Sequence, residues 1–384
     1  MTPRPPSKSS PTSSDVVVRP GIDQDIDALM ELEETAFMGD RMNRRQLRHL
    51  MTRANGAVMV AEAEERLLGS VVLLFRKGTG TARLYSIAVS SQARGRGIGR
   101  LLLEEAEKEA WRHERSWVRA EIRKDNSASI HLFESAGYRR FGELEDYYED
   151  EMDAWRYEKT LDPRLRPSLG RVPYYQQTLD FTCGPAALMM AMASLRPGLT
   201  MDRAEELRLW REATTIFMTS GHGGCGPFGL ALAAHRRGFG SAVIVSDPGV
   251  HMVDSVRSPE KQEVMALVQA DMEAEIARLG IPVEIGAVSL EEMERRFGEG
   301  EIPLMMISSW QIYEERVPHW VVVTGFDAHF IYVNDPWLDT AEGEVPTDSI
   351  NMPIGRELFQ RMAKYGRRQL QTAVFVSQRS DSDK

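Results

Sequence analysis

Cysteine is scarce in this sequence, because its 384 residues contain only Cys183 and Cys225. Small secreted domains depend on several disulfides, and the start of the chain shows no signal-peptide pattern. The sequence therefore does not favour a disulfide scaffold, and each cysteine is a candidate nucleophile.

Long hydrophobic runs and an excess of positive charge are also missing. No apolar run approaches the roughly eighteen residues of a membrane span, so we expect no membrane partner. The formal net charge is −10, which argues against bulk binding of nucleic acid, because such binding depends on neutralising phosphates. Residues 1–15 are rich in proline, serine and threonine without an apolar segment, so we expect a disordered tail and a cytoplasmic protein.

The length exceeds that of one ordinary domain, and a content of 42% hydrophobic and 27% charged residues is typical of globular domains. Residues 162–171 combine proline, charge and glycine without periodicity, which is typical of a linker. We therefore expect a first domain over residues 16–161, a linker over 162–171, a second domain over 172–378 and a disordered tail over 379–384.

Hydrophobic spacing in the first domain predicts helices near residues 26–37 and 43–52, then a hairpin from 57–63 and 67–75. A strand that ends at Val89 precedes a short polar loop and a helix over about residues 97–115. A strand at 117–122, a helix that Asp125 or Asn126 caps and Gly137 ends, and a further strand complete the domain.

Glycines at three alternate positions, Gly95, Gly97 and Gly99, open the helix after Val89. Alternate glycines let successive backbone amides turn toward one point, and the helix start adds unpaired amides and the positive end of its dipole. A dinucleotide fingerprint needs a glycine where Arg100 stands, and a P-loop needs Lys and then Ser or Thr after its last glycine. The pattern therefore predicts a phosphate pocket of another kind.

This loop resembles the acetyl-CoA pyrophosphate loop of the GNAT N-acetyltransferases, Gln/Arg-x-x-Gly-x-Gly/Ala, at Arg94, Gly97 and Gly99. The order of elements is also similar to that of a GNAT domain, and the ribosomal-protein N-terminal alanine acetyltransferases match best. The resemblance implies an α/β fold with a mixed central sheet flanked by helices, and acetyl-CoA as cosubstrate. It implies that Ile87 and Val89 hydrogen-bond the pantetheine through their strand. The remaining cofactor contacts that it implies are Arg94, Gly95, Arg96, Gly97, Ile98, Gly99, Arg100 and Asn126.

Glu121 lies five residues before Asn126, where the resembling enzymes carry a glutamate general base. A buried glutamate can accept a proton from an amine near neutral pH. The alternative is an exposed carboxylate at a strand end that pairs with Arg119 or Arg123.

Phe133 departs from the family pattern Leu-Tyr-x-x-x-Gly-Phe, in which the tyrosine is the general acid. A phenyl ring has no proton to give to the leaving thiolate. Three outcomes stay open: Tyr147 or Tyr148 supplies the acid, the thiolate leaves without one, or transfer is weak or lost. The sequence therefore predicts acetyl-CoA binding and leaves turnover open.

In the second domain an apolar helix begins at Cys183, and further helices are predicted near residues 202–214, 226–237 and 258–279. Predicted strands follow at 304–308, 320–327, 330–334 and 372–376. Helices first and strands later indicate an α+β domain.

Cys183 starts its helix, where the helix dipole and free amides stabilise a thiolate. A nucleophilic cysteine needs a histidine base and a group that orients the histidine. His319 opens one predicted strand and Asp335 follows the next. If these strands pair in antiparallel fashion, both side chains lie at one end of the sheet.

The chain order Gln177, Cys183, His319, Asp335 resembles that of papain-like cysteine peptidases, in which a glutamine six residues before the cysteine helps to form the oxyanion hole. The Cys-Gly-Pro-Ala-Ala-Leu and Asn-Asp-Pro motifs are similar to those of peptidases that trim double-glycine leaders from bacteriocin precursors, over residues 172–340. The resemblance implies a papain-like fold with a Cys-His-Asp triad. Residues 205–282 are expected to form a helical insertion without a counterpart, which leaves the substrate open.

Cys225 precedes another apolar helix and is an alternative nucleophile or a thiol lining the cleft, but no glutamine precedes it at the matching distance. Metal binding by Cys225, His222, His235 and His251 fits no zinc spacing, so we expect no metal.

Together these features predict a bifunctional protein with a GNAT acetyltransferase acting on a peptide or protein amine and a cysteine peptidase acting on amide bonds. Two alternatives stay open. The second site is an acyltransferase or amidase if an amine, rather than water, takes the acyl group from Cys183. The first domain is a degenerate GNAT domain if it only senses acetyl-CoA and regulates the second. The sequence does not determine the oligomeric state.

Overall fold

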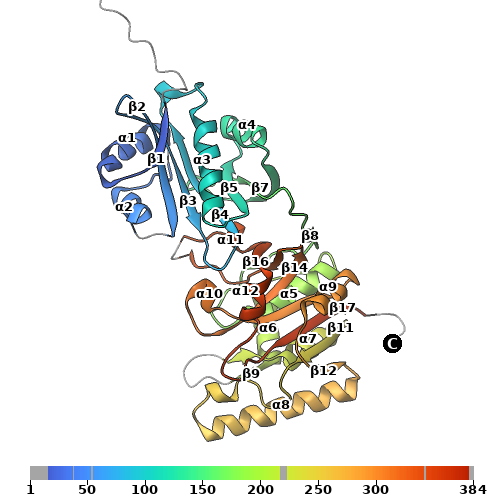
Figure 1. The fold of residues 1–384 in the computed structure, drawn as a ribbon. Coiled ribbons are helices and arrows are strands. Elements are labelled where there is room, and N and C mark those ends of the chain that lie inside the picture. The colour runs from blue at the N-terminus through green and yellow to red at the C-terminus, as the bar shows by residue number, and fades with distance from the viewer. Residues whose placement is uncertain (1–15, 38, 53–54, 217–222, 341–342, 380–384) are drawn as a thin grey trace, which may run out of the picture. The chain divides into compact units, whose positions relative to one another are not determined.

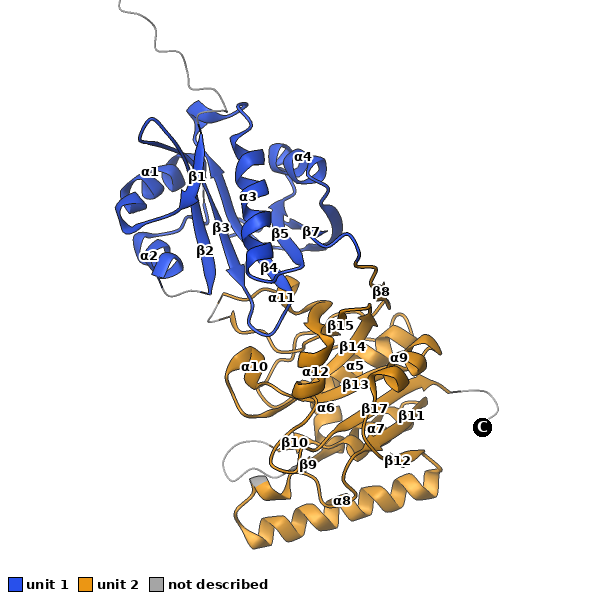
Figure 2. Ribbon diagram, in the orientation of Figure 1, with its two compact units in different colours: residues 1–164 blue, residues 165–384 orange. Residues whose placement is uncertain are grey.

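The computed structural model describes residues 16–37, 39–52, 55–216, 223–340 and 343–379 (Figure 1). The expected tails at 1–15 and 379–384 lie outside these ranges, apart from residue 379. The chain divides into two compact units, residues 1–164 and 165–384, which are drawn blue and orange in Figure 2.

The first unit is built on a seven-stranded sheet with the order β1-β2-β3-β4-β5-β7-β6. All neighbouring strands in it are antiparallel except β4 and β5. The strands are β1 (Val17–Pro20), β2 (Gly56–Ala63), β3 (Arg66–Phe75), β4 (Thr81–Val89), β5 (Trp117–Arg123), β6 (Arg139–Leu144) and β7 (Ala154–Thr160). The parallel pair requires a crossover, which the helix after the glycine loop supplies.

Helices cover both faces of this sheet. They are α1 (Ile26–Ala36), α2 (Arg44–Thr52), α3 (Ile98–Arg112) and α4 (Ser127–Ser135), with short 3₁₀ turns η2 (Asp23–Asp25) and η3 (Ser91–Ala93). The crossover helix α3 buries Leu102, Ala106 and Ala110, which recur at helical spacing, against strands β2 to β5. On the other face α1 and α2 pack Leu29 and Leu47 against strands β2 and β3.

Strand β4 contains a bulge beyond the residues that pair with β5. Ser86 pairs with Val72 and Leu84 pairs with Leu73, so Tyr85 is an extra residue in the ladder. A bulge increases the local twist of a strand. The ladder between β4 and β5 extends only over residues 81–83 and 117–119, and within the described ranges the rest of β4 is paired with β3 alone.

The second unit contains an eight-stranded sheet with the order β12-β11-β17-β13-β14-β15-β16, to which β8 adds alongside β14. Its strands are β8 (Ser168–Leu169), β11 (Phe239–Val245), β12 (Val283–Ile285), β13 (Ile302–Ser308), β14 (Pro318–Phe326), β15 (Phe330–Asn334), β16 (Met352–Gly355) and β17 (Thr372–Gln378). A separate two-stranded sheet pairs β9 (Thr214–Ile216) with β10 (Gly224–Cys225).

Helices also lie on both faces of the second sheet. The helices of this unit are α5 (Cys183–Leu195), α6 (Arg203–Ala213), α7 (Pro227–Arg236), α8 (Pro259–Leu279), α9 (Leu290–Gly298), α10 (Trp310–Tyr313), α11 (Pro346–Ser349) and α12 (Arg356–Met362), with a 3₁₀ turn η4 (Val253–Ser255). Helices α5 and α7 pack on one face with Leu304 and Val322, and α9 and α12 pack on the other with Met305 and Val321. Because both faces are covered, the central strands are apolar without alternation.

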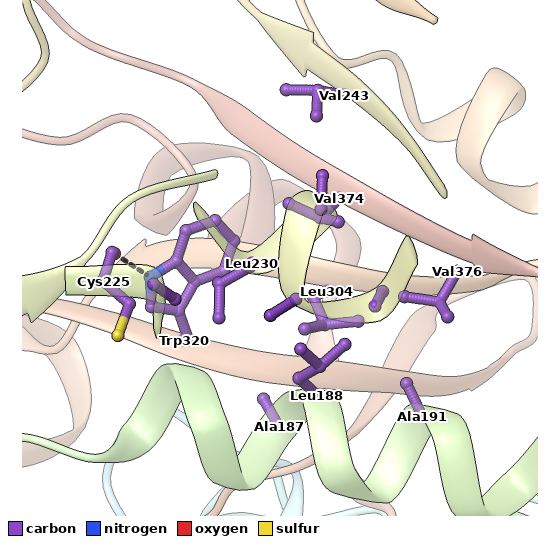
Figure 3. Close-up of a cluster of buried hydrophobic side chains, with 14 of the residues drawn as sticks. Ala187, Leu188, Ala191, Cys225, Leu230, Val243, Leu304, Trp320, Val374 and Val376 are labelled. Atoms are coloured by element: carbon purple, nitrogen blue, oxygen red, sulfur yellow. Dashed lines mark hydrogen bonds between the residues drawn. The ribbon is translucent and has the colours of Figure 1, made fainter. Parts of the chain in front are cut away.

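Figure 3 shows the core on the α5 side, where Leu188 of α5, Leu230 of α7 and Leu304 of β13 meet. The indole Nε1 of Trp320 donates a hydrogen bond of 3.0 Å to the carbonyl oxygen of Cys225. This contact joins the small sheet to β14, one residue after His319.

The structure differs in detail from two expectations about the chain after residue 161. The expected insertion at 205–282 is not wholly helical, because it contains β11, which pairs with β17 in the main sheet. The order is therefore not helices first and strands later. The expected linker 162–171 contains β8, which pairs with Gly325 and Phe326. Within the described ranges, none of the helices has the length and hydrophobicity to cross a membrane.

Candidate functional site

The glycine loop leads from η3 into α3. Gly95 has a φ of +73°, and Gly97, the N-cap residue of α3, has a φ of +78°. Side chains strain this left-handed backbone region, so both positions favour glycine. At Gly99 an added Cβ would come 3.3 Å from Leu132 Cδ2 of α4. The loop thus presents bare backbone next to the free amides of the first turn of α3.

The three arginines of the loop differ in their surroundings. Arg94 and Arg100 are exposed and Arg96 is partly buried. The Arg100 Nε lies 2.8 Å from Glu104 Oε1, and its Nη1 donates to the carbonyl of Ser135 at 3.1 Å. The side chain of Arg100, which stands in the first turn of α3, is therefore held by contacts to α3 and to the end of α4.

The expected pantetheine edge is the end of β4. Ile87 pairs with Val71 and Val89 with Gly69, both on β3. Toward β5 this part of β4 has no ladder partner within the described ranges, so its backbone can pair with an extended ligand. The side chain of Asn126 caps α4, because its Oδ1 accepts a hydrogen bond of 3.0 Å from the Ser129 amide.

Glu121 is a buried carboxylate on β5, and its side chain is only 4% exposed. Its Oε2 accepts a hydrogen bond of 2.8 Å from the Nε of Arg83 on β4. The expected alternative, an exposed carboxylate paired with Arg119 or Arg123, is wrong. Arg119 pairs with Glu158 instead, and Arg123 pairs with Asp125 and Asp150.

Two tyrosines lie beside this pair. Arg83 Nη2 donates a hydrogen bond of 2.7 Å to the Tyr147 hydroxyl, and the Tyr148 hydroxyl lies 3.4 Å from the carbonyl oxygen of Glu121. Burial and then the charge of Glu121 raise the pKa of Tyr148, so this tyrosine keeps its proton. Phe133 is 1% exposed and packs edge-on against Tyr138 in the core. The tyrosines near Glu121 are therefore those of the segment between β6 and β7.

Cys183 is the first residue of α5 and is partly buried. Helix α5 packs against β14, the strand that carries His319. Burial alone lowers the pKa of His319, but the charge and hydrogen bond of Asp335, with a contribution from Cys183, raise it to about 10. The charge of Asp335 therefore favours the protonated form of His319.

His319 and Asp335 lie together, as the pairing of their strands predicts. The His319 Nε2 is 2.6 Å from Asp335 Oδ1, and the aspartate side chain is fully buried. The amide of Trp337 also donates to Oδ1 at 2.9 Å, and the Tyr313 hydroxyl donates to Oδ2 at 2.8 Å. Tyr313 could not be identified from the sequence, because its four-residue helix α10 is too short to show periodicity.

Gln177 precedes the cysteine helix and is 6% exposed. Its side-chain nitrogen Nε2 donates a hydrogen bond of 2.7 Å to the carbonyl oxygen of Leu179. Its backbone amide donates to the carbonyl of Pro336 at 2.9 Å, one residue after Asp335. This contact ties the glutamine segment to the aspartate turn.

Cys225 differs from Cys183 in its surroundings. It is 5% exposed, and burial, with the charge of Cys183 adding to it, raises the pKa of its thiol. A thiol held neutral is a poor nucleophile. His222 lies outside the described residues, and no group of three or more potential metal ligands occurs in the described part of the chain.

The first unit is similar to known acetyltransferases. Residues 26–138 match the Acetyltransferase (GNAT) family. An uncharacterised N-acetyltransferase from Methanocaldococcus jannaschii is 29% identical over 140 residues, which cover 36% of this chain and 88% of that protein. The GNAT family uses acetyl-CoA.

Two solved structures align with the same part of the chain. One is a ribosomal-protein-alanine N-acetyltransferase from Brucella melitensis, with 26% identity, 38% of this chain and 99% of that chain covered, and a TM-score of 0.34. The other is the ribosomal-protein-S18-alanine N-acetyltransferase from Escherichia coli, with 20% identity, 39% and 99% covered, and a TM-score of 0.35.

The second unit matches a different family. Residues 172–377, more than half of the chain, match the Peptidase_C39 like family. The chain therefore belongs to the Peptidase_C39 like family and carries a GNAT acetyltransferase domain in its first unit.

Proposed function

We propose that this protein is a bifunctional enzyme in which a papain-like cysteine peptidase site cleaves an amide bond and a GNAT site acetylates a peptide or protein amine. The observation that carries the peptidase activity is the 2.6 Å contact between His319 Nε2 and Asp335 Oδ1, on the strand against which the helix of Cys183 packs. Acetylation of the α-amine that cleavage exposes would join the two activities in one reaction sequence.

Cys183, His319 and Asp335 divide the work of amide cleavage. The Cys183 thiolate attacks the carbonyl carbon, a C–S bond forms, and the amine leaves with a proton from the His319 imidazolium. Neutral His319 then takes a proton from water, which attacks the thioester and releases the acid and the thiolate. Asp335 fixes the imidazole and stabilises its charged form. The pKa of His319, raised to about 10, supports an imidazolium at neutral pH that can give this proton to the leaving amine.

Gln177 is proposed as an oxyanion donor. Its Nε2 carries two hydrogens, and the bond to the Leu179 carbonyl uses one of them. The backbone amide of Cys183 stands in the first turn of α5, where amides lack partners within the helix. These two donors would stabilise the oxygen of the tetrahedral intermediate.

We propose the following roles for residues of the GNAT site. Acetyl-CoA would supply the thioester acetyl group and a thiolate leaving group. The backbone of Ile87 and Val89 would bind the pantetheine, and the loop from Arg94 to Arg100 would bind the pyrophosphate at the start of α3. Glu121 would accept the proton of the acceptor amine, and Tyr148 would hold the proton that the leaving thiolate needs.

A second candidate function is acetyl-CoA binding without turnover. Two observations favour it: Phe133 lies in the core where the family has its acid, and Arg83 occupies one oxygen of Glu121. In that case the first unit would sense acetyl-CoA and regulate the second.

Mass spectrometry of a peptide library incubated with the protein, with and without acetyl-CoA, tests the proposal. We expect cleaved peptides in both samples and a mass gain of one acetyl group only with acetyl-CoA. Cys183→Ala should abolish cleavage, Glu121→Gln should abolish acetylation, and Cys225→Ala should change neither. Added amines that capture the acyl group would identify an acyltransferase instead.

Calorimetry separates the second candidate from the first. Binding of acetyl-CoA without any acetylated product, together with a change in cleavage rate on its addition, would favour the sensor. Absence of acetyl-CoA binding would rule out both uses of the first unit. Cleavage that persists in Cys183→Ala would rule out the peptidase assignment.

A further inference from the structure

The second unit contains a carboxylate that the mechanism above does not use. Glu206, on α6, is 0% exposed. It lies within the stretch for which the sequence offered no counterpart and no function. Burial of an ionised carboxylate is unfavourable unless partners compensate for the lost hydration. No basic side chain pairs with Glu206 within the described ranges, so hydrogen bonds must compensate.

These hydrogen bonds come from one short segment, residues 175–182. Glu206 Oε2 accepts from the Tyr175 hydroxyl at 3.0 Å and from Thr178 Oγ1 at 2.7 Å. Glu206 Oε1 accepts from the Thr178 backbone amide at 2.8 Å and from Thr182 Oγ1. Burial and the bond to Glu206 raise the pKa of Tyr175, so its hydroxyl stays a donor. Each oxygen thus has two donors.

The positions of these donors relate directly to the candidate site. Thr178 follows Gln177, and Thr182 precedes Cys183 and is the N-cap residue of α5. Glu206 therefore binds Thr178 and Thr182, the first and last residues of the segment between Gln177 and Cys183. On its other side the segment is anchored by the bond from the Gln177 amide to the Pro336 carbonyl.

A charged carboxylate also suits this place electrostatically. Glu206 lies in the first turn of α6 and binds the N-cap residue of α5. The positive ends of two helices therefore stabilise its charge. An apolar side chain would offer no acceptor to the Thr178 amide, and an unpaired buried donor is costly.

From this geometry we infer that Glu206 is a positioning residue that sets the distance between Gln177 and Cys183 and thereby forms the oxyanion hole. The inference rests on the proposed peptidase function. It requires that loss of the carboxylate impairs stabilisation of the oxyanion much more than it impairs the reactivity of the thiolate.

Two probes separate these effects. Alkylation of Cys183 by iodoacetamide needs a thiolate and no oxyanion hole. A peptide aldehyde needs both: Cys183 Sγ forms a bond to the aldehyde carbon, the C=O π bond breaks, and its electron pair moves to the oxygen, whose negative charge the oxyanion donors stabilise. The probes are iodoacetamide and a panel of N-acetylated tripeptide aldehydes that end in glycinal, alaninal or leucinal.

Glu206→Leu removes all four acceptor contacts, Glu206→Gln keeps an oxygen for the Thr178 amide, and Glu205→Gln is the matched control. Glu205 is the neighbour of Glu206 on α6, and its carboxylate pairs with Arg237 at 2.5 Å. In Glu206→Gln the amide nitrogen can replace Oε2, because both donors there are hydroxyls that can turn to accept.

We expect Glu206→Leu to weaken aldehyde binding about tenfold or more, since removal of one oxyanion donor costs about 10² to 10³ in rate. The alkylation rate at its pH plateau should stay within about threefold of wild type, because the thiolate and its imidazolium partner are unchanged. Glu206→Gln should bind aldehydes within about threefold of wild type, because its side chain can keep all four hydrogen bonds to residues 175–182. Glu205→Gln should match wild type, because it leaves Glu206 and its partners unchanged.

The double variant Tyr175→Phe with Thr178→Val keeps Glu206 but removes both donors to Oε2, and it provides the test if Glu206→Leu does not fold. We expect the same selective loss of aldehyde binding. Folded variants that bind aldehydes as wild type does would overturn the role of Glu206. Equal losses in both probes would also overturn it, because they would indicate a general structural role. Wild-type protein that binds no aldehyde and is not alkylated selectively at Cys183 would instead overturn the peptidase function itself.

Discussion

The imidazole of His319 and the carboxylate of Asp335 form a buried pair in the second unit, with 2.6 Å between Nε2 and Oδ1. Asp335 lies just beyond the end of β15 and His319 near the start of β14, so the antiparallel pairing of these strands places them together. The carboxylate is fully buried and accepts two further hydrogen bonds, from Trp337 and Tyr313. These contacts hold the carboxylate of Asp335 against the imidazole.

Asp335→Asn should lower the pKa of His319 from about 10 toward its ordinary value of 6.5, because the variant removes the charge that raises it. A histidine whose pKa is higher in the folded than in the unfolded protein stabilises the fold in its protonated form. This stabilisation is fully present below about pH 6.5 and is lost as the pH rises through about 10. NMR titration of ¹³C-labelled histidine measures the pKa, and His319→Gln assigns the signal. Equal pKa values in wild type and variant would contradict the pairing.

Tyr313→Phe should weaken the support of Asp335 without removing its charge. The hydroxyl donates to Oδ2 at 2.8 Å, and hydrogen bonds to charged groups contribute about 1.5 to 3 kcal/mol. We expect a loss of this size in the free energy of unfolding of the second unit, measured by urea denaturation. Tyr365→Phe is the control, because the hydroxyl of Tyr365 donates a hydrogen bond to the exposed carbonyl of Arg316. Loss of this bond should change the free energy of unfolding little.

Gly97→Ala should weaken acetyl-CoA binding, because a Cβ at a φ of +78° strains the backbone at the start of α3 by about 1 to 2 kcal/mol. Gly137→Ala is a matched control with a φ of +88°, after α4 and outside the loop. Both variants should lose similar thermal stability, but only Gly97→Ala should bind acetyl-CoA less tightly by calorimetry. Equal affinities would place the pyrophosphate elsewhere.

Glu121→Gln should abolish acetyl transfer and destabilise the first unit, because it leaves Arg83 buried without its carboxylate. Breaking a buried ion pair by removing one partner costs about 3 to 5 kcal/mol. Glu143→Gln is the control, since Glu143 forms an exposed pair with Lys124 that should contribute less than about 1 kcal/mol. Acetyl-CoA binding should survive in both, and a fully active Glu121→Gln would remove Glu121 from the mechanism.

Patterns that depend on local spacing were readable from the sequence. The alternate glycines, the helix that starts at Cys183 and the cap at Asn126 follow from rules that act within a few residues. The juxtaposition of His319 and Asp335 was also predictable, because consecutive strands with a short connection pair as a hairpin.

Contacts between distant segments could not be predicted. Glu121 pairs with Arg83 on β4 rather than with a neighbour on its own strand, because the side chains of β4 and β5 share a face only once the two strands pair. Strand β11 was hidden within an apparent helical stretch, and Glu206 had no visible partner, because its donors lie from 24 to 31 residues earlier. Such contacts depend on tertiary packing and have no signature in local spacing.

The place of β17 has a consequence for how the protein folds during synthesis. This strand, the last in the described chain, lies between β11 and β13 in the middle of the second sheet. The sheet is therefore incomplete until the chain has been made through residue 378. Before then the strand that carries His319 does not have its complete set of neighbouring strands. The strands of the first unit are complete by Thr160, so that unit can fold on the ribosome before synthesis of the second unit is finished. Acetyl-CoA binding should thus arise earlier in the life of each molecule than thiol reactivity.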